Sequence, residues 1–241
     1  MIRTTFDREL QEVQDEMLAL GTIIEEALTD AVASLKARDF ERSRAIIIQD
    51  HEINQKRFEI EQQVIELITT GQPMASDSRL LAAILELTSE LERIGDYAKG
   101  IAKINLLIGH EELIMPELSD ITQMAEKARA MLHRGLAAFI QGDIEAARAI
   151  PQEDEVVDAH YEQLYHKLLT YIMEDPHAIK QVNYLIWAAH NLERAADRVT
   201  NLCERVIFTV TGELEELDAD QELALLDLPL LPPHEPPAEA L

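Results

Sequence analysis

The stretch Leu91-Glu-Arg-Ile-Gly-Asp96 occurs a second time, with the same charged skeleton, as Leu192-Glu-Arg-Ala-Ala-Asp197. The two copies are separated by 193 − 92 = 101 residues. Closer to the start of each half, Asp39-Phe-Glu-Arg-Ser-Arg-Ala-Ile46 matches Asp143-Ile-Glu-Ala-Ala-Arg-Ala-Ile150, at an offset of 143 − 39 = 104. The three-residue difference falls in the loop between the second and third helical segments of each half. The chain is therefore predicted to be an internal duplication.

Around these repeats, apolar residues recur every three or four positions, which is the period of a helix with one buried face. Helical runs are predicted at about 6–37, 40–70, 78–108, 117–141, 144–174 and 177–211. The breakers Gly71-Gln-Pro73, Gly142-Asp143 and Asp175-Pro176 separate several of them. Asp39 and Asp143 are predicted N-caps. Six long antiparallel helices predict an all-α fold of two tandem, pseudo-symmetric three-helix bundles, over residues 1–109 and 115–212.

The remaining segment, 213–241, differs in composition. It holds nine acidic residues and five prolines, and it has no lysine or arginine. Such a segment packs poorly, so disorder is expected from about Asp218. A solubilising extension and a docking tail around Leu223 to Leu231 both remain open.

The charge balance of the whole chain narrows the possible functions. The 241 residues carry 46 Asp and Glu against 21 Lys and Arg, a net charge of −25. This disfavours electrostatic binding to nucleic acid or to anionic lipid, and it suits divalent cations or basic protein surfaces. Cys203 is the only cysteine, no signal peptide is recognisable and no run of 18 apolar residues occurs. A cytosolic chain without a membrane span is therefore expected.

Acidic pairs in each half are candidate metal ligands. Glu92 and Asp96 lie one helical turn apart, and Glu193 with Asp197 repeats the pair. The preceding helix of each half carries a second pair with the same spacing, and these pairs are Asp50 with Asn54 and Asp154 with Asp158. Adjacent antiparallel helices can bring such pairs together, and oxygen-rich sites suit hard or borderline cations. The alternative is a solvated acidic face.

Three further side chains near the motifs are open to two interpretations. Arg93 and Arg194 follow the repeated glutamates, and each is either an exposed helix former or a clamp on a carboxylate of a neighbouring helix. His190 precedes the second motif and is either an extra ligand or a surface histidine.

Four segments together resemble the PhoU family of phosphate-signalling proteins. They are Phe6-Asp-Arg-Glu-Leu10, Pro73-Met-Ala-x-Asp77-x-Arg79, Leu91-Glu-Arg-Ile-Gly-Asp-Tyr-Ala98 and Leu192-Glu-Arg-Ala-Ala-Asp-Arg-Val-Thr-Asn201. The resemblance runs from about residue 4 to 216. It implies two three-helix bundles whose carboxylate clusters bind iron or other divalent metal ions. The implied ligands are Asp50, Asn54, Glu92, Asp96, Asp154, Asp158, Glu193 and Asp197. Asn54 stands where the second half has Asp158, which implies weaker metal binding in the first half.

The resemblance also implies a role. It predicts a non-enzymatic cytoplasmic regulator that represses phosphate uptake and the phosphate-starvation response. Its partners would be the ATPase subunit of the phosphate transporter and the phosphate-sensing histidine kinase, and a homodimer is expected. The alternatives are a carboxylate-bridged metalloenzyme and a metal-storage protein. Against an enzyme, no helical Glu-x-x-His pair of a di-iron oxidase occurs. No Gly-rich phosphate loop occurs either, so no nucleotide site is expected.

Overall fold

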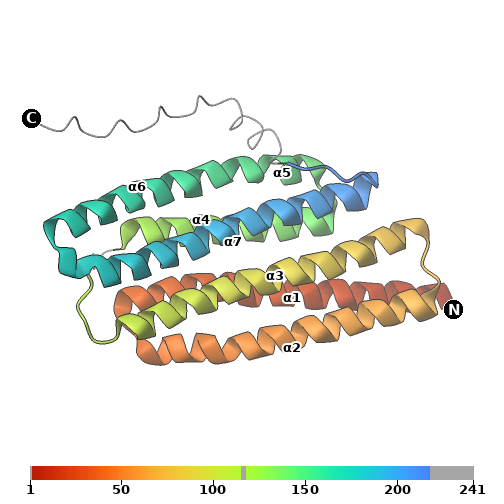
Figure 1. Ribbon diagram of the computed structural model, residues 1–241. Helices are drawn as coiled ribbons and strands as arrows, with labels where there is room; N and C mark the ends of the chain where they lie inside the picture. The colour runs from red at the N-terminus through yellow and green to blue at the C-terminus, as the bar shows by residue number, and fades with distance from the viewer. Residues whose placement is uncertain (1, 115–117, 218–241) are drawn as a thin grey trace, which may run out of the picture.

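The computed structural model describes residues 2–114 and 118–217, and all regular elements within them are helices (Figure 1). The first bundle consists of α1 (Ile2–Ala37), α2 (Phe40–Gly71) and α3 (Ala75–Ile108). The second consists of α4 (Ser119–Gln141), α5 (Ile144–Ala149), α6 (Asp154–Glu174) and α7 (Ile179–Thr211). The predicted all-α fold of two tandem bundles is confirmed. The disorder predicted from Asp218 onward lies outside the described residues.

The second bundle departs from the predicted helical runs at two prolines. The run expected over 144–174 is divided into α5, a single 3-10 turn at Pro151–Glu153, and α6. Proline has no backbone N–H to donate, and its ring clashes with the carbonyl four residues earlier, so an α-helix cannot pass through Pro151 undisturbed. The equivalent residue in the first half is Ile47, since 151 − 104 = 47, and α2 is continuous there. A second 3-10 turn, Pro176–Ala178, precedes α7.

The two predicted N-caps are confirmed. The carboxylate of Asp39 accepts a hydrogen bond from the backbone N–H of Arg42, with a nitrogen–oxygen distance of 2.9 Å. Asp143 accepts one from the N–H of Ala146 at 3.0 Å. Each carboxylate satisfies one of the free N–H groups at the start of a helix. The repeat that the sequence shows at these positions is thus a repeated local structure.

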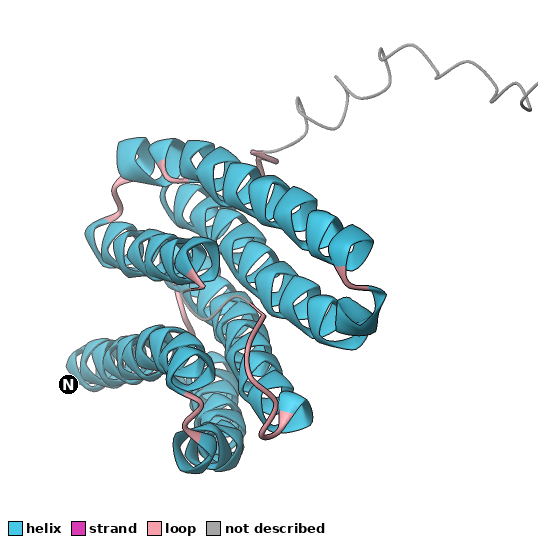
Figure 2. Ribbon diagram, turned by 90° about the vertical axis from the view of Figure 1, so that its left-hand side faces the viewer, coloured by secondary structure: helices cyan, strands magenta, loops and turns pink. Residues whose placement is uncertain are grey.

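The bundles pack side by side, with α3 against α7 and α1 against α4, while α2 and α6 lie on the outside (Figures 1 and 2). Each bundle has a core of fully buried side chains, such as Leu91 in α3 and Leu192 in α7. Close approach of α1 to α4 depends on Gly21, where an added Cβ would lie 2.3 Å from the Cδ1 atom of Leu136. Since α3 packs against α7, the repeated acidic motifs lie on the two helices that join the bundles.

Among the described helices, none is long and apolar enough to cross a membrane.

Candidate functional site: two acidic clusters and the cleft between the bundles

The first cluster consists of Asp50 and Asn54 on α2 with Glu92 and Asp96 on α3. Its centre is occupied by an ammonium group of the chain itself. The Lys99 Nζ atom lies 2.7 Å from Asp50 Oδ2 and 2.6 Å from Asp96 Oδ1. Burial of Lys99 lowers its pKa, but the hydrogen bonds to Asp50 and Asp96 outweigh that effect, so the pKa is raised. Lys99 therefore stays charged and neutralises the carboxylates around it.

The other two members of the first cluster also have partners. The Asn54 side-chain amide donates to the backbone oxygen of Asp50 at 2.9 Å and to its Oδ2 at 3.3 Å. The Glu92 Oε2 atom lies 3.6 Å from Nη1 of Arg57. Burial and the neighbouring Asp96 nevertheless raise the pKa of Glu92. The first cluster is thus a set of three carboxylates facing two cations, Lys99 and Arg57.

The second cluster consists of Asp154 and Asp158 on α6 with Glu193 and Asp197 on α7. Burial, followed by repulsion from Asp197 and Asp158, raises the pKa of Asp154 to about 8. Burial is also the largest cause that raises the pKa values of Asp158, Glu193 and Asp197. The Oδ1 atom of Asp154 is buried and has no hydrogen-bond partner in the structure. The second cluster therefore holds more negative charge than its surroundings compensate.

The difference between the clusters follows from three substitutions between the repeats. With the offset of 101, Lys99 corresponds to Thr200, and with the offset of 104, Arg57 corresponds to Tyr161. Asn54 corresponds to Asp158, as the sequence already indicates. Burial and then the charge of Glu193 raise the pKa of the Tyr161 hydroxyl, in accord with its place beside the cluster. The second cluster has gained one carboxylate and lost both cations.

Basic groups do approach the second cluster from its edge. The Nδ1 atom of His190 lies 2.9 Å from Glu193 Oε2, so His190 forms an ion pair when it is protonated. Arg198 and Arg194 act on Asp197 and partly offset the rise of its pKa. The structure thus places His190 against a cluster residue. None of these groups bridges two carboxylates as Lys99 does.

The sequence reasoning missed Lys99, although a signal for it was present. Lys99 follows Asp96 by three positions, which places both on one helix face. When the alignment of the two repeats at the offset of 101 is continued three residues past Asp96 and Asp197, Lys99 stands opposite Thr200. The acidic pairs are common to both halves, whereas Lys99 occurs in the first half only. A search for repeated residues therefore does not find it.

The contacts in the described residues bear on the predicted metal sites. Within residues 2–114 and 118–217, no three His, Cys, Asp or Glu side chains converge in an arrangement that would hold a metal ion. The eight predicted ligands therefore remain a prediction. The chemistry of the donor set differs between the halves, because the first cluster already has an internal cation and no such cation bridges the hard oxygen donors of the second. Each cluster has a buried carboxylate oxygen without a hydrogen-bond partner, Oδ1 of Asp50 in the first and Oδ1 of Asp154 in the second.

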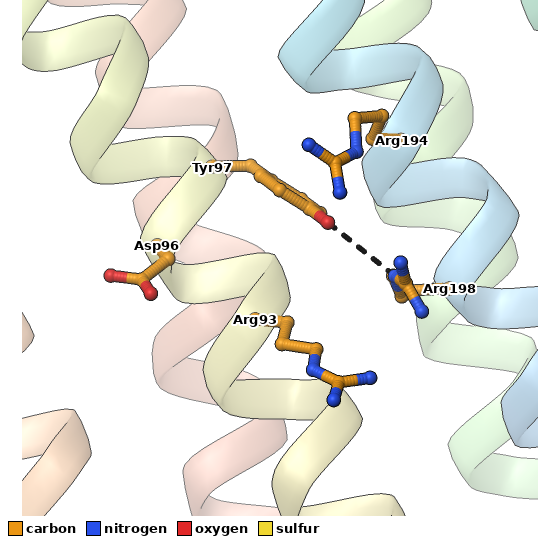
Figure 3. Close-up of a pocket in the computed structure, with 5 residues that line it drawn as sticks. All are labelled: Arg93, Asp96, Tyr97, Arg194 and Arg198. Carbon is orange, nitrogen blue, oxygen red and sulfur yellow. Dashed lines mark hydrogen bonds between the residues drawn. The ribbon is translucent and has the colours of Figure 1, made fainter.

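A cleft of about 400 Å³ lies between α3 and α7, beside both clusters, and five residues line it (Figure 3). They are Arg93, Asp96, Tyr97, Arg194 and Arg198. Arg93 bonds to Glu90 of its own helix at 2.7 Å, so it does not clamp a carboxylate of a neighbouring helix. The guanidinium of Arg194 lies over the ring of Tyr97, 4.9 Å from its centroid. The repeated arginine of each half thus faces the boundary between the bundles.

Comparison with known proteins supports the duplication and identifies the family. A family model of the PhoU domain matches the chain twice, over residues 17–104 and 121–206, so that each match contains one acidic cluster. The chain belongs to the PhoU family. A PhoU protein of Edwardsiella tarda, named a phosphate-specific transport system accessory protein, is 34% identical over 208 residues, which cover 86% of this chain and 85% of that protein. A PhoU homologue of Streptococcus pneumoniae is 34% identical over 217 residues, which cover 90% of this chain and 100% of the homologue.

Solved PhoU structures have the same fold. The crystal structure of the phosphate transport system regulatory protein PhoU from Streptococcus pneumoniae superposes with a TM-score of 0.81 at 34% identity, and covers 88% of this chain and 100% of that one. PhoU from Pseudomonas aeruginosa gives 0.81 at 33% identity, over 86% of this chain and 100% of that one. The family resemblance recognised from the motifs is therefore confirmed, and it includes the fold of both halves.

Proposed function

We propose that this chain is a non-enzymatic cytoplasmic regulator that represses phosphate uptake and the phosphate-starvation response. It acts as an adaptor between the ATPase subunit of a phosphate transporter and a phosphate-sensing histidine kinase. The observation that carries the proposal is the match of both halves to relatives named as accessory or regulatory proteins of phosphate transport.

The surface of the molecule supports an adaptor role. The net charge of −25 suits basic patches on partner proteins and would guide their approach. The outer helices also expose apolar side chains, which suit protein contact: Phe58 and Ile65 on α2 are 59% and 56% exposed, and Met173 on α6 is 84% exposed. Helices α2 and α6 lie on opposite sides of the molecule, so two partners, or one partner and a second copy of the chain, have room to bind at once (Figure 1).

We propose in addition that a divalent metal ion binds to the second cluster in preference to the first. Asp154, Asp158, Glu193 and Asp197 would supply the oxygen donors. A bound ion would neutralise carboxylates that otherwise repel one another, and so change the local charge that a partner meets. The first cluster has Lys99 in this role already, so metal binding there would require the lysine to move.

The test is binding of the purified full chain to the host's transporter ATPase subunit and to the cytoplasmic part of its sensor kinase. Biolayer interferometry at moderate salt, with a chelator or with added Mn²⁺, measures both affinity and its dependence on metal. We expect saturable binding to both partners and a change of affinity with metal. Absence of binding to either partner under both conditions would overturn the proposed function.

Two charge-matched variants separate the metal from general acidity. Asp154→Asn on α6 with Asp197→Asn on α7 removes two acids of the second cluster, while Glu162→Gln with Glu174→Gln removes two exposed acids of α6 outside the cluster. Only the first pair is expected to abolish the effect of Mn²⁺ on affinity. An equal loss in both would assign the effect to the overall charge of the chain.

A further inference from the structure

We infer that the cleft between α3 and α7 is a binding site for a phosphate-type oxyanion. The cleft shares Asp96 with the first acidic cluster and includes no member of the second. Its arginines include the repeated one of each half, Arg93 and Arg194, which correspond at the offset of 101. The third, Arg198, corresponds to Tyr97 of the first half. Packing of α3 against α7 brings these four side chains from two bundles to one place (Figure 3).

The cleft carries an excess of positive charge in a strongly acidic chain. Glu90 is the carboxylate that pairs with two of the arginines, since it lies 2.7 Å from Arg93 and 3.4 Å from Arg198. Asp96 also lines the cleft, but it points away from the arginines in Figure 3, and Lys99 holds it at 2.6 Å. Two of the three guanidinium groups, those of Arg93 and Arg198, therefore share one carboxylate, that of Glu90.

Arg194 is the residue whose charge is least compensated. Among the described residues, no carboxylate oxygen lies within 4.0 Å of its guanidinium nitrogens, and the contact that the structure gives it is with the Tyr97 ring. Its charge acts on Asp197 of the second cluster, which lies on its own helix. An arginine held on an aromatic face keeps its N–H groups free for a ligand.

The arrangement of the guanidinium groups fits a tetrahedral oxyanion. The hydroxyl of Tyr97 accepts a hydrogen bond from Arg198 Nε at 3.4 Å, and Arg194 stacks on the ring of the same tyrosine. Tyr97, which is buried, thus positions two planar forks of donors at the mouth of the cleft. Such forks bind phosphate oxygens in pairs, with geometry that a lysine does not provide. The volume of about 400 Å³ admits a free phosphate ion or the phosphoryl group of a larger molecule.

A ligand in this cleft would touch both bundles at once. Two of its binding residues, Arg194 and Arg198, directly follow Glu193 and Asp197 in the sequence, so its charge would act on the second cluster. Phosphate would then act on the same cluster that the proposed metal ion occupies. This role rests on the proposed function, whereas binding of the anion itself does not, because it is measured on the isolated chain.

The experiment is isothermal titration calorimetry of the full chain at constant ionic strength in chloride, with two arms. One titrant is inorganic phosphate, and the other is phosphoserine, a phosphate monoester. We expect saturable binding in at least one arm. Tighter binding of inorganic phosphate identifies the free ion as the ligand, whereas tighter binding of phosphoserine identifies a phosphoryl group on a larger molecule. Arg194→Gln should weaken binding about tenfold or more, as expected for loss of charge-assisted hydrogen bonds.

A matched control distinguishes the cleft from general charge. Arg205, on the same helix, pairs with Glu86 at 2.5 Å across the same boundary but does not line the cleft, so Arg205→Gln should leave binding unchanged. Arg194→Lys keeps the charge, loses the planar fork and should also weaken binding, which tests the geometry without a change of net charge. Absence of saturable binding in both arms, or equal binding by Arg194→Gln and the unaltered chain, would overturn the inference. A chain that binds its protein partners but neither titrant would retain the proposed function and lose this site.

Discussion

The two acidic clusters occupy equivalent positions of the two repeats, but the negative charge of their carboxylates is compensated in different ways. In the first, Lys99 bridges Asp50 and Asp96, and Arg57 approaches Glu92. In the second, Thr200 and Tyr161 take the places of those cations and Asp158 adds a carboxylate. Carboxylates removed from water need a counter-charge, a proton or a metal ion. The comparison shows that a lysine of the chain bridges two carboxylates of the first cluster, while the second cluster has basic groups only at its edge.

The largest effect is expected when the internal cation of the first half is removed. Lys99→Met keeps much of the apolar stem but leaves Asp50, which is 7% exposed, without its ion pair. We expect a loss of about 2–3 kcal/mol in the free energy of unfolding, because an unpaired buried carboxylate keeps its desolvation cost. Urea denaturation measures it. The matched control is Lys103→Met, an exposed lysine one turn further along α3. A loss no larger than that of the control would refute the counter-ion role of Lys99.

The next effect concerns the missing cation of the second half. Addition of Mn²⁺ should raise the stability of the unaltered chain, by about 2.7 kcal/mol when its concentration is a hundred times the dissociation constant. Asp154→Asn with Asp197→Asn should abolish this gain. Glu92→Gln, in the first cluster, should leave the gain intact. Thermal melts with and without the ion measure this gain. A gain that depends on Glu92 and not on Asp154 would show that the first cluster, and not the second, binds the ion.

The sequence was sufficient for the fold because its signals were redundant. Periodicity, caps at Asp39 and Asp143 and the repeated Leu-Glu-Arg-x-x-Asp motif all indicated the same helices. The break at Pro151 is the element that the periodicity concealed, because the apolar pattern continues through it while the backbone cannot.

The site was less accessible to sequence reasoning. The spacing of Glu92 and Asp96 predicts that they share one helix face, but it does not predict that Lys99, three residues further along, pairs with Asp96 there. The cleft was missed for a related reason: Arg93 and Arg194 are 101 residues apart, and only the packing of α3 on α7 brings them together. Local patterns predict elements, whereas contacts between the two halves depend on how the bundles are joined.

The pH dependence of stability should also differ between the clusters. In the second, the pKa of Asp154 is raised from 3.8 to about 8, so the native chain binds more protons than the unfolded chain between these values. Stability contributed by this group is therefore present at low pH and lost as pH rises towards 8. The groups that act on Asp154 and its neighbours are Asp158, Glu193, Asp197, His190, Arg194 and Arg198.

Asp154→Asn removes this titration and should stabilise the chain at pH 8 but not at pH 5. The cluster is partly open to water, and screening reduces the gain to about 1 kcal/mol, well below what the full shift would give. Asp50→Asn in the first cluster should instead destabilise the chain at both values, since Lys99 then loses a partner. Urea denaturation at pH 5 and pH 8 measures both. A gain for Asp154→Asn that is equal at the two pH values would show that ionisation of the buried Asp154 carboxyl is not its cause.

The smallest effect is expected at the two N-caps, which the repeats share and which therefore serve as the baseline for the comparison. Asp39→Ala should cost about 1 kcal/mol of global stability, because it uncaps a continuous helix, α2. Asp143→Ala removes an equivalent hydrogen bond, but α5 has six residues and Pro151 separates it from α6. Fraying can then stay within α5, so the global loss should be about 0.5 kcal/mol, with faster hydrogen exchange at residues 144–149. Asp39→Ser and Asp143→Ser keep a capping oxygen and should restore most of each loss. Equal global losses for the two alanine variants would mean that Pro151 bends the second half without uncoupling its first turn.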